Sequence, residues 1–273
     1  KLLPKGGDLT QIKNYRPISL LPIDQKVLSS ILNKRCASTF DEALSTEQAG
    51  FRVGYSTLDC IHTLNILLSH SKEWRFPLYL LFLDIAKAFD SVTTESVLSA
   101  METQGVDSQI TEYVQKLVSR SFVVVNGRKV PIQVGKGVRQ GDCLSPRLFT
   151  AVLQDVFGRM DWTGKGIKVD GQFLNHLLFA DDAVLIAPSH LQIQEMVDEL
   201  ERTLADVGLK MNGSKTLAMS TSAGDVTVGG ISVKVVPKVI YLGAQLCIDG
   251  DQSGELQRRI RAGVFAFYKY RSF

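Results

Sequence analysis

The sequence predicts an α+β fold in which a mixed sheet packs against helices. Continuous apolar runs over residues 78–83 and 177–187 are typical of buried strands, and two adjacent aspartates interrupt the second run. Several other segments carry apolar residues three and four positions apart, which is the period of an amphipathic helix. Because the sequence has no internal repeat and few stretches with the composition of a linker, we expect the 273 residues to form one body.

The composition is that of a soluble globular protein, with 45% hydrophobic and 22% charged residues. A net charge of +3 permits a nucleic-acid partner without indicating one. The four cysteines lie far apart, without Cys or His companions at metal-ligand spacing, so we expect reduced thiols, an intracellular location and no zinc site. Since no apolar run approaches the length of a membrane span and the amino terminus lacks a signal pattern, we expect no membrane partner.

Two stretches of the first 55 residues are expected to be irregular, with a helix between them. Residues 1–21 are rich in structure-breaking prolines and glycines, and a helix capped by Asp24 is expected over residues 25–37. Arg52 follows in a loop between two glycines, where a ligand could approach the backbone closely. This arginine could hold a phosphate through two hydrogen bonds, or it could be an ordinary loop arginine.

Ser56 and Asp59 have the spacing of a capping box, which predicts the start of the next helix. The elements expected up to residue 134, besides the strand at 78–83, are helices over 57–71, 94–103 and 108–120 and a β-hairpin over 121–134 that turns at Asn126-Gly127.

Asp84 ends the apolar run over residues 78–83, and strand ends are where ligands collect in mixed sheets. The small side chains of Ala86 and Ala88 would let a substrate lie against the backbone, and Phe89 would put a ring beside it. The alternatives are that Asp84 caps a helix and that Phe89 belongs to the core.

A loop over residues 135–144 is rich in glycine and carries two cations before a helix that begins at Ser145-Pro146. Glycines and cations ahead of a helix N-terminus suit an anionic ligand. The loop lacks the spacing of a P-loop, which argues against a simple ATPase.

The adjacent carboxylates of Asp181 and Asp182 interrupt the second apolar run, and we expect residues 180–182 to be the tip of a β-hairpin. Two unit charges about 4 Å apart repel by roughly 4 kcal/mol near a protein surface, so such a pair needs a cation or exposure to solvent. Mg²⁺ is commonly held by one or two carboxylates together with substrate phosphates, and Asp84 would be a natural third carboxylate. The alternative is a solvated turn.

The remaining residues predict a helix that begins with a capping box at Ser189 and stops at Gly208. A strand and tight turn carrying Lys215 follow, then short hairpins up to residue 247. A basic helix is expected over residues 254–273; such a helix is usually a solvated face, although it could follow a nucleic-acid backbone. Because the chain starts with Lys1 and ends within this helix, we expect it to be a segment of a longer protein.

Seven blocks of this sequence, in this order, resemble the reverse transcriptase domain of non-LTR (LINE-type) retrotransposons. The blocks are Asn14 to Leu21, Glu47 to Arg52, Phe82 to Asp90, Gly137 to Pro146, Phe179 to Asp182, Gly208 to Thr216 and Tyr241 to Gly243. Phe179 stands where many relatives carry tyrosine, a change that leaves the carboxylates in place.

The resemblance implies a right-hand polymerase with an antiparallel palm sheet packed on helices and a truncated thumb. The implied domains are fingers in residues 1–77, palm in 78–104 and 135–250, an insertion of fingers and palm in 105–134, and the start of the thumb in 251–273. It also implies an RNA template, a DNA primer, dNTPs and two Mg²⁺ ions, for which Mn²⁺ could substitute. A longer polyprotein with an endonuclease domain, located in the nucleus and in cytoplasmic ribonucleoprotein, is expected from the family.

The resemblance also assigns roles to single residues. The implied catalytic residues are Asp84, Asp181 and Asp182, and the implied metal ligands are these three carboxylates and the backbone carbonyl of Ile85. The implied dNTP-binding residues are Arg52 for the triphosphate, Ala86, Phe89 as a gate against the 2′-hydroxyl, Gln140, Gly141, and Lys215 as a proton donor to pyrophosphate.

Two other functions are compatible with these residues. A decayed or domesticated copy could keep the fold and bind RNA without polymerising, but such a copy would be expected to lose carboxylates first. A palm-like cyclase or a metal-dependent phosphohydrolase could also use paired aspartates, although neither needs a gate at Phe89 or a glutamine-glycine loop.

Overall fold

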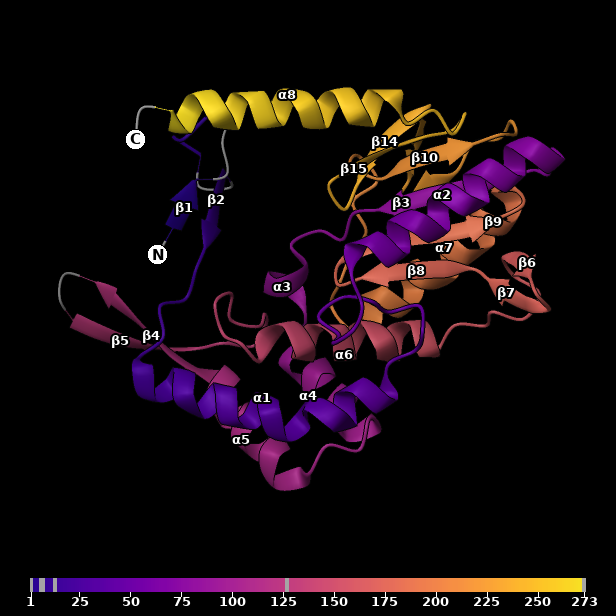
Figure 1. Cartoon of the computed structure of the whole chain (residues 1–273). Helices are drawn as coiled ribbons and strands as arrows, with labels where there is room; N and C mark the ends of the chain where they lie inside the picture. The colour runs from indigo at the N-terminus through magenta and orange to yellow at the C-terminus, as the bar shows by residue number, and fades with distance from the viewer. Residues whose placement is uncertain (1, 5–7, 12–13, 126–127, 272–273) are drawn as a thin grey trace. The chain divides into compact units, whose positions relative to one another are not determined.

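The structure is a computed structural model that describes residues 2–4, 8–11, 14–125 and 128–271 (Figure 1). The chain divides into two compact units. Unit 1 comprises Lys1–Val53, Ile85–Met160 and Leu200–Lys210, and unit 2 comprises Gly54–Asp84, Asp161–Glu199 and Met211–Phe273. Each unit therefore contains segments that are far apart in the sequence.

A five-stranded sheet forms the centre of unit 2, and it is mixed, as expected. Its strands, in spatial order, are β13 (Lys234–Val235), β10 (Leu217–Ser220), β3 (Tyr79–Leu83), β9 (Asp182–Ala187) and β8 (His176–Phe179). β13 is parallel to β10, and the other neighbours are antiparallel. Every residue of β3 is buried, which explains why its sequence is a continuous apolar run rather than an alternating pattern.

Helices and small hairpins complete unit 2. Their bounds are α2 (Thr57–Trp74), β6 (Ile167–Val169), β7 (Gln172–Leu174), β11 (Thr227–Val228), β12 (Ile231–Ser232), β14 (Lys238–Tyr241), β15 (Ala244–Cys247) and α8 (Ser253–Tyr270). The predicted capping box at Ser56 and Asp59 starts α2, which packs against β8 and β15. α7 (His190–Asp206) begins in unit 2 and ends in unit 1.

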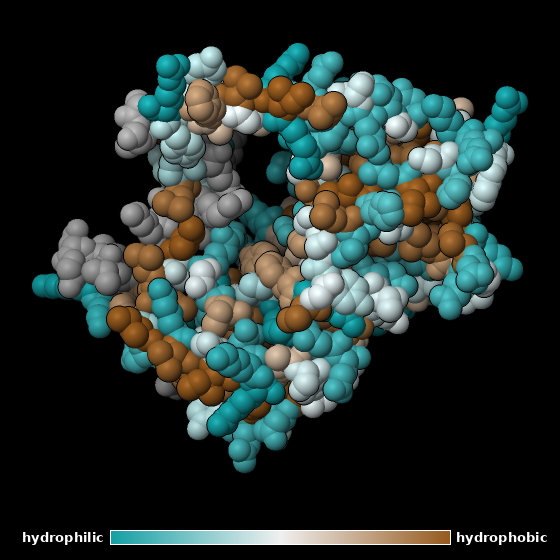
Figure 2. All heavy atoms as spheres, in the orientation of Figure 1, coloured by the Kyte–Doolittle hydropathy of each residue, from teal (hydrophilic) through white to brown (hydrophobic). Residues whose placement is uncertain are grey.

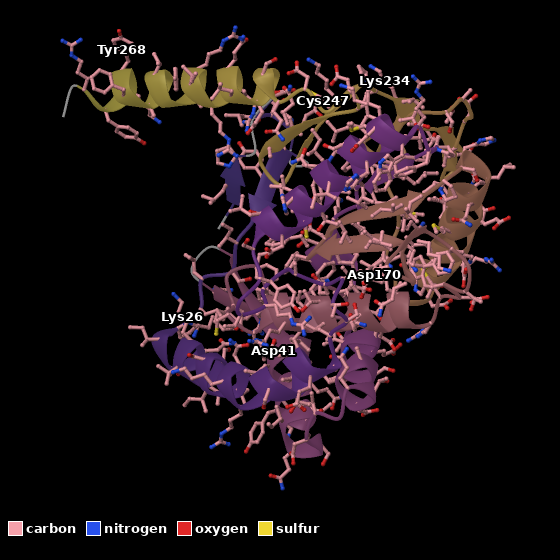
Figure 3. The ribbon with its side chains drawn as sticks, turned by 45° about the vertical axis from the view of Figure 1, so that its right-hand side comes forward. Lys26, Asp41, Asp170, Lys234, Cys247 and Tyr268 are labelled. Carbon is pink, nitrogen blue, oxygen red and sulfur yellow. The ribbon has the colours of Figure 1, made fainter. Side chains whose placement is uncertain are left out.

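Unit 1 is mainly helical. Its elements are β1 (Leu2–Pro4), β2 (Tyr15–Pro17), α1 (Ile23–Ala43), α3 (Ala88–Ser91), α4 (Thr94–Thr103), α5 (Ser108–Ser119), β4 (Arg120–Val125), β5 (Arg128–Gln133) and α6 (Ser145–Gly158). α6 packs against α1 and α4, and its apolar face, including Phe149, is buried. Asp41 on α1, labelled in Figure 3, accepts a hydrogen bond of 2.9 Å from the guanidinium of Arg147 on α6.

The structure confirms the α+β class and corrects some local predictions. α1 begins directly after Pro22, so Asp24 lies inside the first turn instead of capping it. Of the strand and tight turn expected over residues 209–216, the strand is absent from the described chain, and the segment after α7 leads through a turn into β10. The hairpin over 121–134 is present as β4 and β5, while its predicted turn at Asn126-Gly127 lies outside the described residues.

Two further expectations concern cysteines and membranes. The four cysteines are free thiols, and three of them are buried. In the described part of the chain, no helix combines the length and the apolar character needed to cross a membrane.

Candidate active site

The register of the sheet in unit 2 brings the predicted carboxylates to one end of neighbouring strands. β3 pairs with β9 so that Leu83 is opposite Ala183, and one step further along the same register Asp84 is opposite Asp182. Residues opposite each other in an antiparallel pair have Cβ atoms about 5 Å apart. Asp84 and Asp182 therefore lie at the same end of two neighbouring strands, and the charge of Asp84 acts on the Asp182 carboxyl.

Asp181 belongs to the tight turn next to this pair. Phe179 pairs with Asp182 across β8 and β9, so the hairpin turns on the two residues Ala180 and Asp181. Ala180 has a φ of +57°, the left-handed conformation that two-residue hairpins need but that favours glycine. The predicted tip at residues 180–182 is thus confirmed, with Asp182 as the first residue of β9 rather than part of the turn.

The backbone of Asp84 is fixed by a turn from a distant part of unit 2. The amide of Asn212 donates to the carbonyl of Asp84 at 2.8 Å, and the amide of Asp84 donates to the hydroxyl of Thr216 at 3.3 Å. The same turn carries Lys215, whose Nζ lies 3.9 Å from a carboxylate oxygen of Asp84. The structure therefore brings Lys215 to the predicted carboxylates, although the ammonium itself remains largely exposed.

At this end of the sheet, the charges of two neighbouring carboxylates act on the carboxyl group of Asp182. Burial of its carboxyl group and the charges of Asp181 and Asp84 raise the pKa of Asp182 to about 6. Tyr241, on β14, is buried, and its ring contacts that of Phe82 in a tilted arrangement with 5.5 Å between centroids and 60° between planes. Burial, the Cys60 thiol and the Asp182 carboxylate together raise the pKa of its phenol.

This donor set fits a hard divalent cation. The charges of Asp181 and Asp84 disfavour the ionised form of the Asp182 carboxyl, a cation would relieve this repulsion, and carboxylate oxygens are the ligands that Mg²⁺ prefers. Across the described residues, no group of three or more His, Cys, Asp or Glu side chains has the arrangement of a metal site. The fit therefore rests on the chemistry and register of the carboxylates.

The predicted nucleotide-binding residues Ala86, Phe89, Gln140 and Gly141 belong to unit 1. Ala86 is half-buried, and its amide donates to the carbonyl of Lys210 at 2.8 Å. Phe89, on the short helix α3, is half-buried, and its ring stacks on Phe149 of α6 with 4.8 Å between centroids. Ile85, directly after Asp84 in the chain, is buried.

Backbone hydrogen bonds join the glycine-rich loop to the segment around α3. The amide of Val138 donates to the carbonyl of Phe89 at 2.8 Å, and that of Gly137 donates to Val92 at 2.6 Å. Gly137 has a φ of +90°, and a Cβ there would lie 3.1 Å from the carbonyl oxygen of Asp90, so both the backbone conformation and the close approach favour glycine. This docking brings Gln140 next to Asp90, and the Gln140 Nε2 donates to a carboxylate oxygen of Asp90 at 3.2 Å.

Arg52 makes hydrogen bonds within its own unit. Its guanidinium donates to the backbone carbonyl of Ser45 at 2.7 Å and to that of Asp41 at 3.2 Å. These hydrogen bonds hold the loop against the end of α1, so Arg52 has the structural role of an ordinary loop arginine. Its role in binding a triphosphate stays a prediction.

Sequence reasoning missed three participants of these arrangements, namely the backbone anchor Thr216, the buried Tyr241 and the partner of Gln140, Asp90. Thr216, Tyr241 and Asp90 lie inside three of the blocks listed above, so the signal was present, but only the fold shows what they contact.

Comparisons with known proteins show that this fold is that of a polymerase domain. Residues 3–246 match the model of the family described as reverse transcriptase (RNA-dependent DNA polymerase). Because this match covers most of the chain, the chain belongs to the reverse transcriptase family.

Proteins of similar sequence belong to retrotransposons, which confirms the predicted resemblance. The chain is 30% identical over 239 residues to the Pol polyprotein of the type-1 retrotransposable element R2 of Popillia japonica, covering 85% of this chain and 32% of that protein. It is 26% identical over 257 residues to the RNA-directed DNA polymerase from mobile element jockey of Drosophila melanogaster, covering 88% of this chain and 28% of that protein. The chain thus spans about a third of the length of these relatives.

Solved structures confirm the predicted right-hand polymerase fold. Telomerase from Candida tropicalis in its apo form aligns with a TM-score of 0.57 at 14% identity, over 84% of this chain and 40% of that chain. At this identity the likeness concerns the fold alone.

Proposed function

We propose that this chain is the catalytic core of a retrotransposon reverse transcriptase, which copies RNA into complementary DNA by adding dNTPs to a primer 3′-hydroxyl. The observation that carries the proposal is the register that sets Asp84 opposite Asp182, beside the turn that contains Asp181. Membership of the reverse transcriptase family and the retrotransposon relatives support the same function.

We assign two Mg²⁺ ions to Asp84, Asp181, Asp182 and the backbone carbonyl of Ile85, with Mn²⁺ as the expected substitute. When bound, such ions lower the pKa of an attacking hydroxyl and neutralise charge on the departing pyrophosphate. The chain contributes carboxylates that are held in advance on a buried strand and on a tight hairpin. Lys215, whose ammonium is near Asp84, is assigned as the proton donor to pyrophosphate.

The dNTP is assigned to residues of unit 1. Arg52 would hold the triphosphate, and Gln140 with Gly141 would line the nucleotide site. The small side chain of Ala86 would leave room for the substrate. Phe89 would exclude a 2′-hydroxyl, and its stacking on Phe149 supports this assignment because a gate must not move aside.

The broader assignments follow from the family. We propose that fingers comprise residues 1–77, palm 78–104 and 135–250, an insertion 105–134, and the start of the thumb 251–273. The proposed partners are an RNA template, a DNA primer and dNTPs. The relatives are Pol polyproteins of which this chain spans about a third, which supports a longer protein here as well. We further propose that this protein has an endonuclease domain and is located in the nucleus and in cytoplasmic ribonucleoprotein.

The test is Mg²⁺-dependent extension of a DNA primer on an RNA template by this chain and by an Asp181→Asn/Asp182→Asn variant. Asp170→Asn is the matched control, because Asp170 is also an exposed hairpin-turn aspartate, labelled in Figure 3, and asparagine tolerates its φ of +48°. We expect template-directed incorporation by the parent and the control, and none by the double variant. Incorporation that persists in the double variant would disprove the carboxylate site, and an inactive parent would favour an RNA-binding domain.

A further inference from the structure

We infer that Asp90 is a positioning residue whose carboxylate holds the side-chain amide of Gln140 in one orientation for nucleotide binding. The two residues are 50 positions apart in the sequence, and the Gln140 Nε2 donates to Asp90 Oδ1 at 3.2 Å. The inference rests on the proposed function, and it adds a residue to which the sequence motifs gave no role.

The backbone on both sides of this contact is already fixed. The loop containing Gln140 is bound to the Asp90 segment through Val138 and Gly137, as described above. On the other side, the Gln140 carbonyl accepts a hydrogen bond of 2.9 Å from the amide of Ser19. Gly141 has a φ of +106°, and a Cβ there would lie 2.9 Å from the Ser19 carbonyl oxygen. The side-chain amide is therefore the part of Gln140 that remains to be oriented.

A glutamine amide needs such a partner because its two ends have opposite hydrogen-bonding character. The terminal torsion of glutamine has a broad, roughly two-fold preference, so rotation by a half-turn exchanges the carbonyl oxygen and the NH₂ group at little cost. An ionised carboxylate only accepts hydrogen bonds. Asp90 therefore selects the orientation in which NH₂ faces the carboxylate and Oε1 is presented as an acceptor.

This arrangement has a consequence for the nucleotide. A site that presents a fixed acceptor favours a ligand with a hydrogen-bond donor at that place, and it loses binding when the acceptor is free to rotate away. Asp90 is exposed and does not belong to the core of unit 1, so its replacement is expected to leave the fold intact.

The experiment measures single-nucleotide incorporation on an RNA template by the parent chain and by Asp90→Ala, Asp90→Asn, Gln140→Ala and the double alanine variant. Asp90→Ala is expected to raise the KM for dNTP by about fivefold to tenfold while kcat changes by less than about twofold. Asp90→Asn keeps an acceptor oxygen for the Gln140 NH₂ group but adds a donor that can pair with Oε1 of the rotated amide, so an intermediate rise in KM of about threefold is expected. In the Gln140→Ala background, Asp90→Ala is expected to have no further effect, because the amide that it orients is gone.

Three results would overturn the inference: equal losses in Asp90→Asn and Asp90→Ala, additive effects in the double variant, or an effect of Asp90→Ala on kcat alone. Thermal unfolding of each variant checks the fold. If Asp90→Ala unfolds at a lower temperature than the parent, Asp90→Asn is compared in the parent and Gln140→Ala backgrounds to decide whether Asp90 acts through Gln140. An inactive parent chain would instead reject the proposed function, and this inference with it, whereas an active parent with additive variants rejects this inference alone.

Discussion

The ring of Phe89 is stacked on the ring of Phe149, with 4.8 Å between centroids and 22° between planes. Phe149 is fully buried on α6, while Phe89 is half-buried on α3. The sequence left two alternatives for Phe89, a core residue or a ring beside the substrate. In the structure, Phe89 packs on the core and is also partly exposed, so the two alternatives are compatible. One face of the ring packs on the core, which fixes the ring and leaves its other parts accessible.

Phe89→Ala is expected to admit ribonucleotides while dNTP incorporation stays largely intact, because the substitution removes the bulk assigned to exclude a 2′-hydroxyl. Discrimination between dNTPs and rNTPs should fall by about tenfold or more, the usual size of a steric selection in a binding pocket. The measurement is the ratio of kcat/KM for one dNTP and its rNTP on the same RNA template. Equal rNTP exclusion by the variant would remove the gate assignment.

Phe149→Leu is expected to weaken the same discrimination without touching the nucleotide, since it removes the surface that holds the Phe89 ring. The change should also cost about 1–2 kcal/mol of unfolding free energy as a large-to-small core substitution. Phe40→Leu is the matched control, because Phe40 is a buried phenylalanine on α1 in the same unit. A drop in discrimination in both variants would indicate general loosening of unit 1 instead of support for the gate.

Local signals in the sequence predicted much of the fold because they act over a few residues. The capping box at Ser56 and Asp59 and the helix over 94–103 are present as predicted. The start of α1 was predicted wrongly: Asp24 is a good cap, but the helix begins directly after Pro22, and Asp24 lies in the first turn, where a negative charge is also favourable. The pairing of β1 with β2 had no signal in an otherwise irregular stretch.

The candidate site was predictable in its residues and not in its geometry. Asp84 and Asp182 could be named from the ends of their apolar runs, but their opposition depends on a register set by pairing between distant strands. The contact of Asp90 with Gln140 likewise depends on the docking of a loop onto a short helix. Such contacts between distant segments produce no pattern of residues from which they could be predicted in a single sequence.

Asp182→Asn is expected to stabilise the metal-free chain at neutral pH, because the charged carboxylate is disfavoured beside Asp84 and Asp181. The folded pKa of about 6 lies above the ordinary value of 3.8, so the folded state gains stability as pH falls from 6 toward 4 and loses it again as pH rises through that range. Asp182 remains accessible to water as a residue, so screening reduces the effect to about 1 kcal/mol.

Urea unfolding in EDTA, with the parent and Asp170→Asn as references, measures this difference at pH 7.5 and pH 4. We expect the advantage of Asp182→Asn at pH 7.5 to vanish at pH 4, where the parent carboxyl is protonated. Addition of Mg²⁺ should stabilise the parent more than the variant, because a ligand that binds the folded state raises its stability. A variant less stable than the parent at pH 7.5 in EDTA would contradict the repulsion among the three carboxylates.

Glu255→Ala is expected to detach the start of α8 from the β14–β15 hairpin. Glu255 accepts a hydrogen bond of 2.9 Å from the amide of Gln245 and is held by Arg258, which also donates to the carbonyl of Gly243. These hydrogen bonds and the charge of Arg258 lower the pKa of Glu255 to about 2, so the carboxylate is charged at neutral pH. The rest of α8 has no buried residue and exposes large hydrophobic side chains, visible as brown atoms in Figure 2, so its first turn carries the attachment.

Hydrogen exchange of the peptide containing Gln245 measures the detachment. Loss of a charge-assisted hydrogen bond should speed exchange of this amide by about tenfold at pH 7. Arg259→Ala is the control, since Arg259 also binds Glu255, at 2.6 Å, and has no contact with the hairpin among the described interactions. If exchange at Gln245 rose equally in Arg259→Ala, or not at all in Glu255→Ala, the hairpin would be held by contacts other than the Glu255 carboxylate.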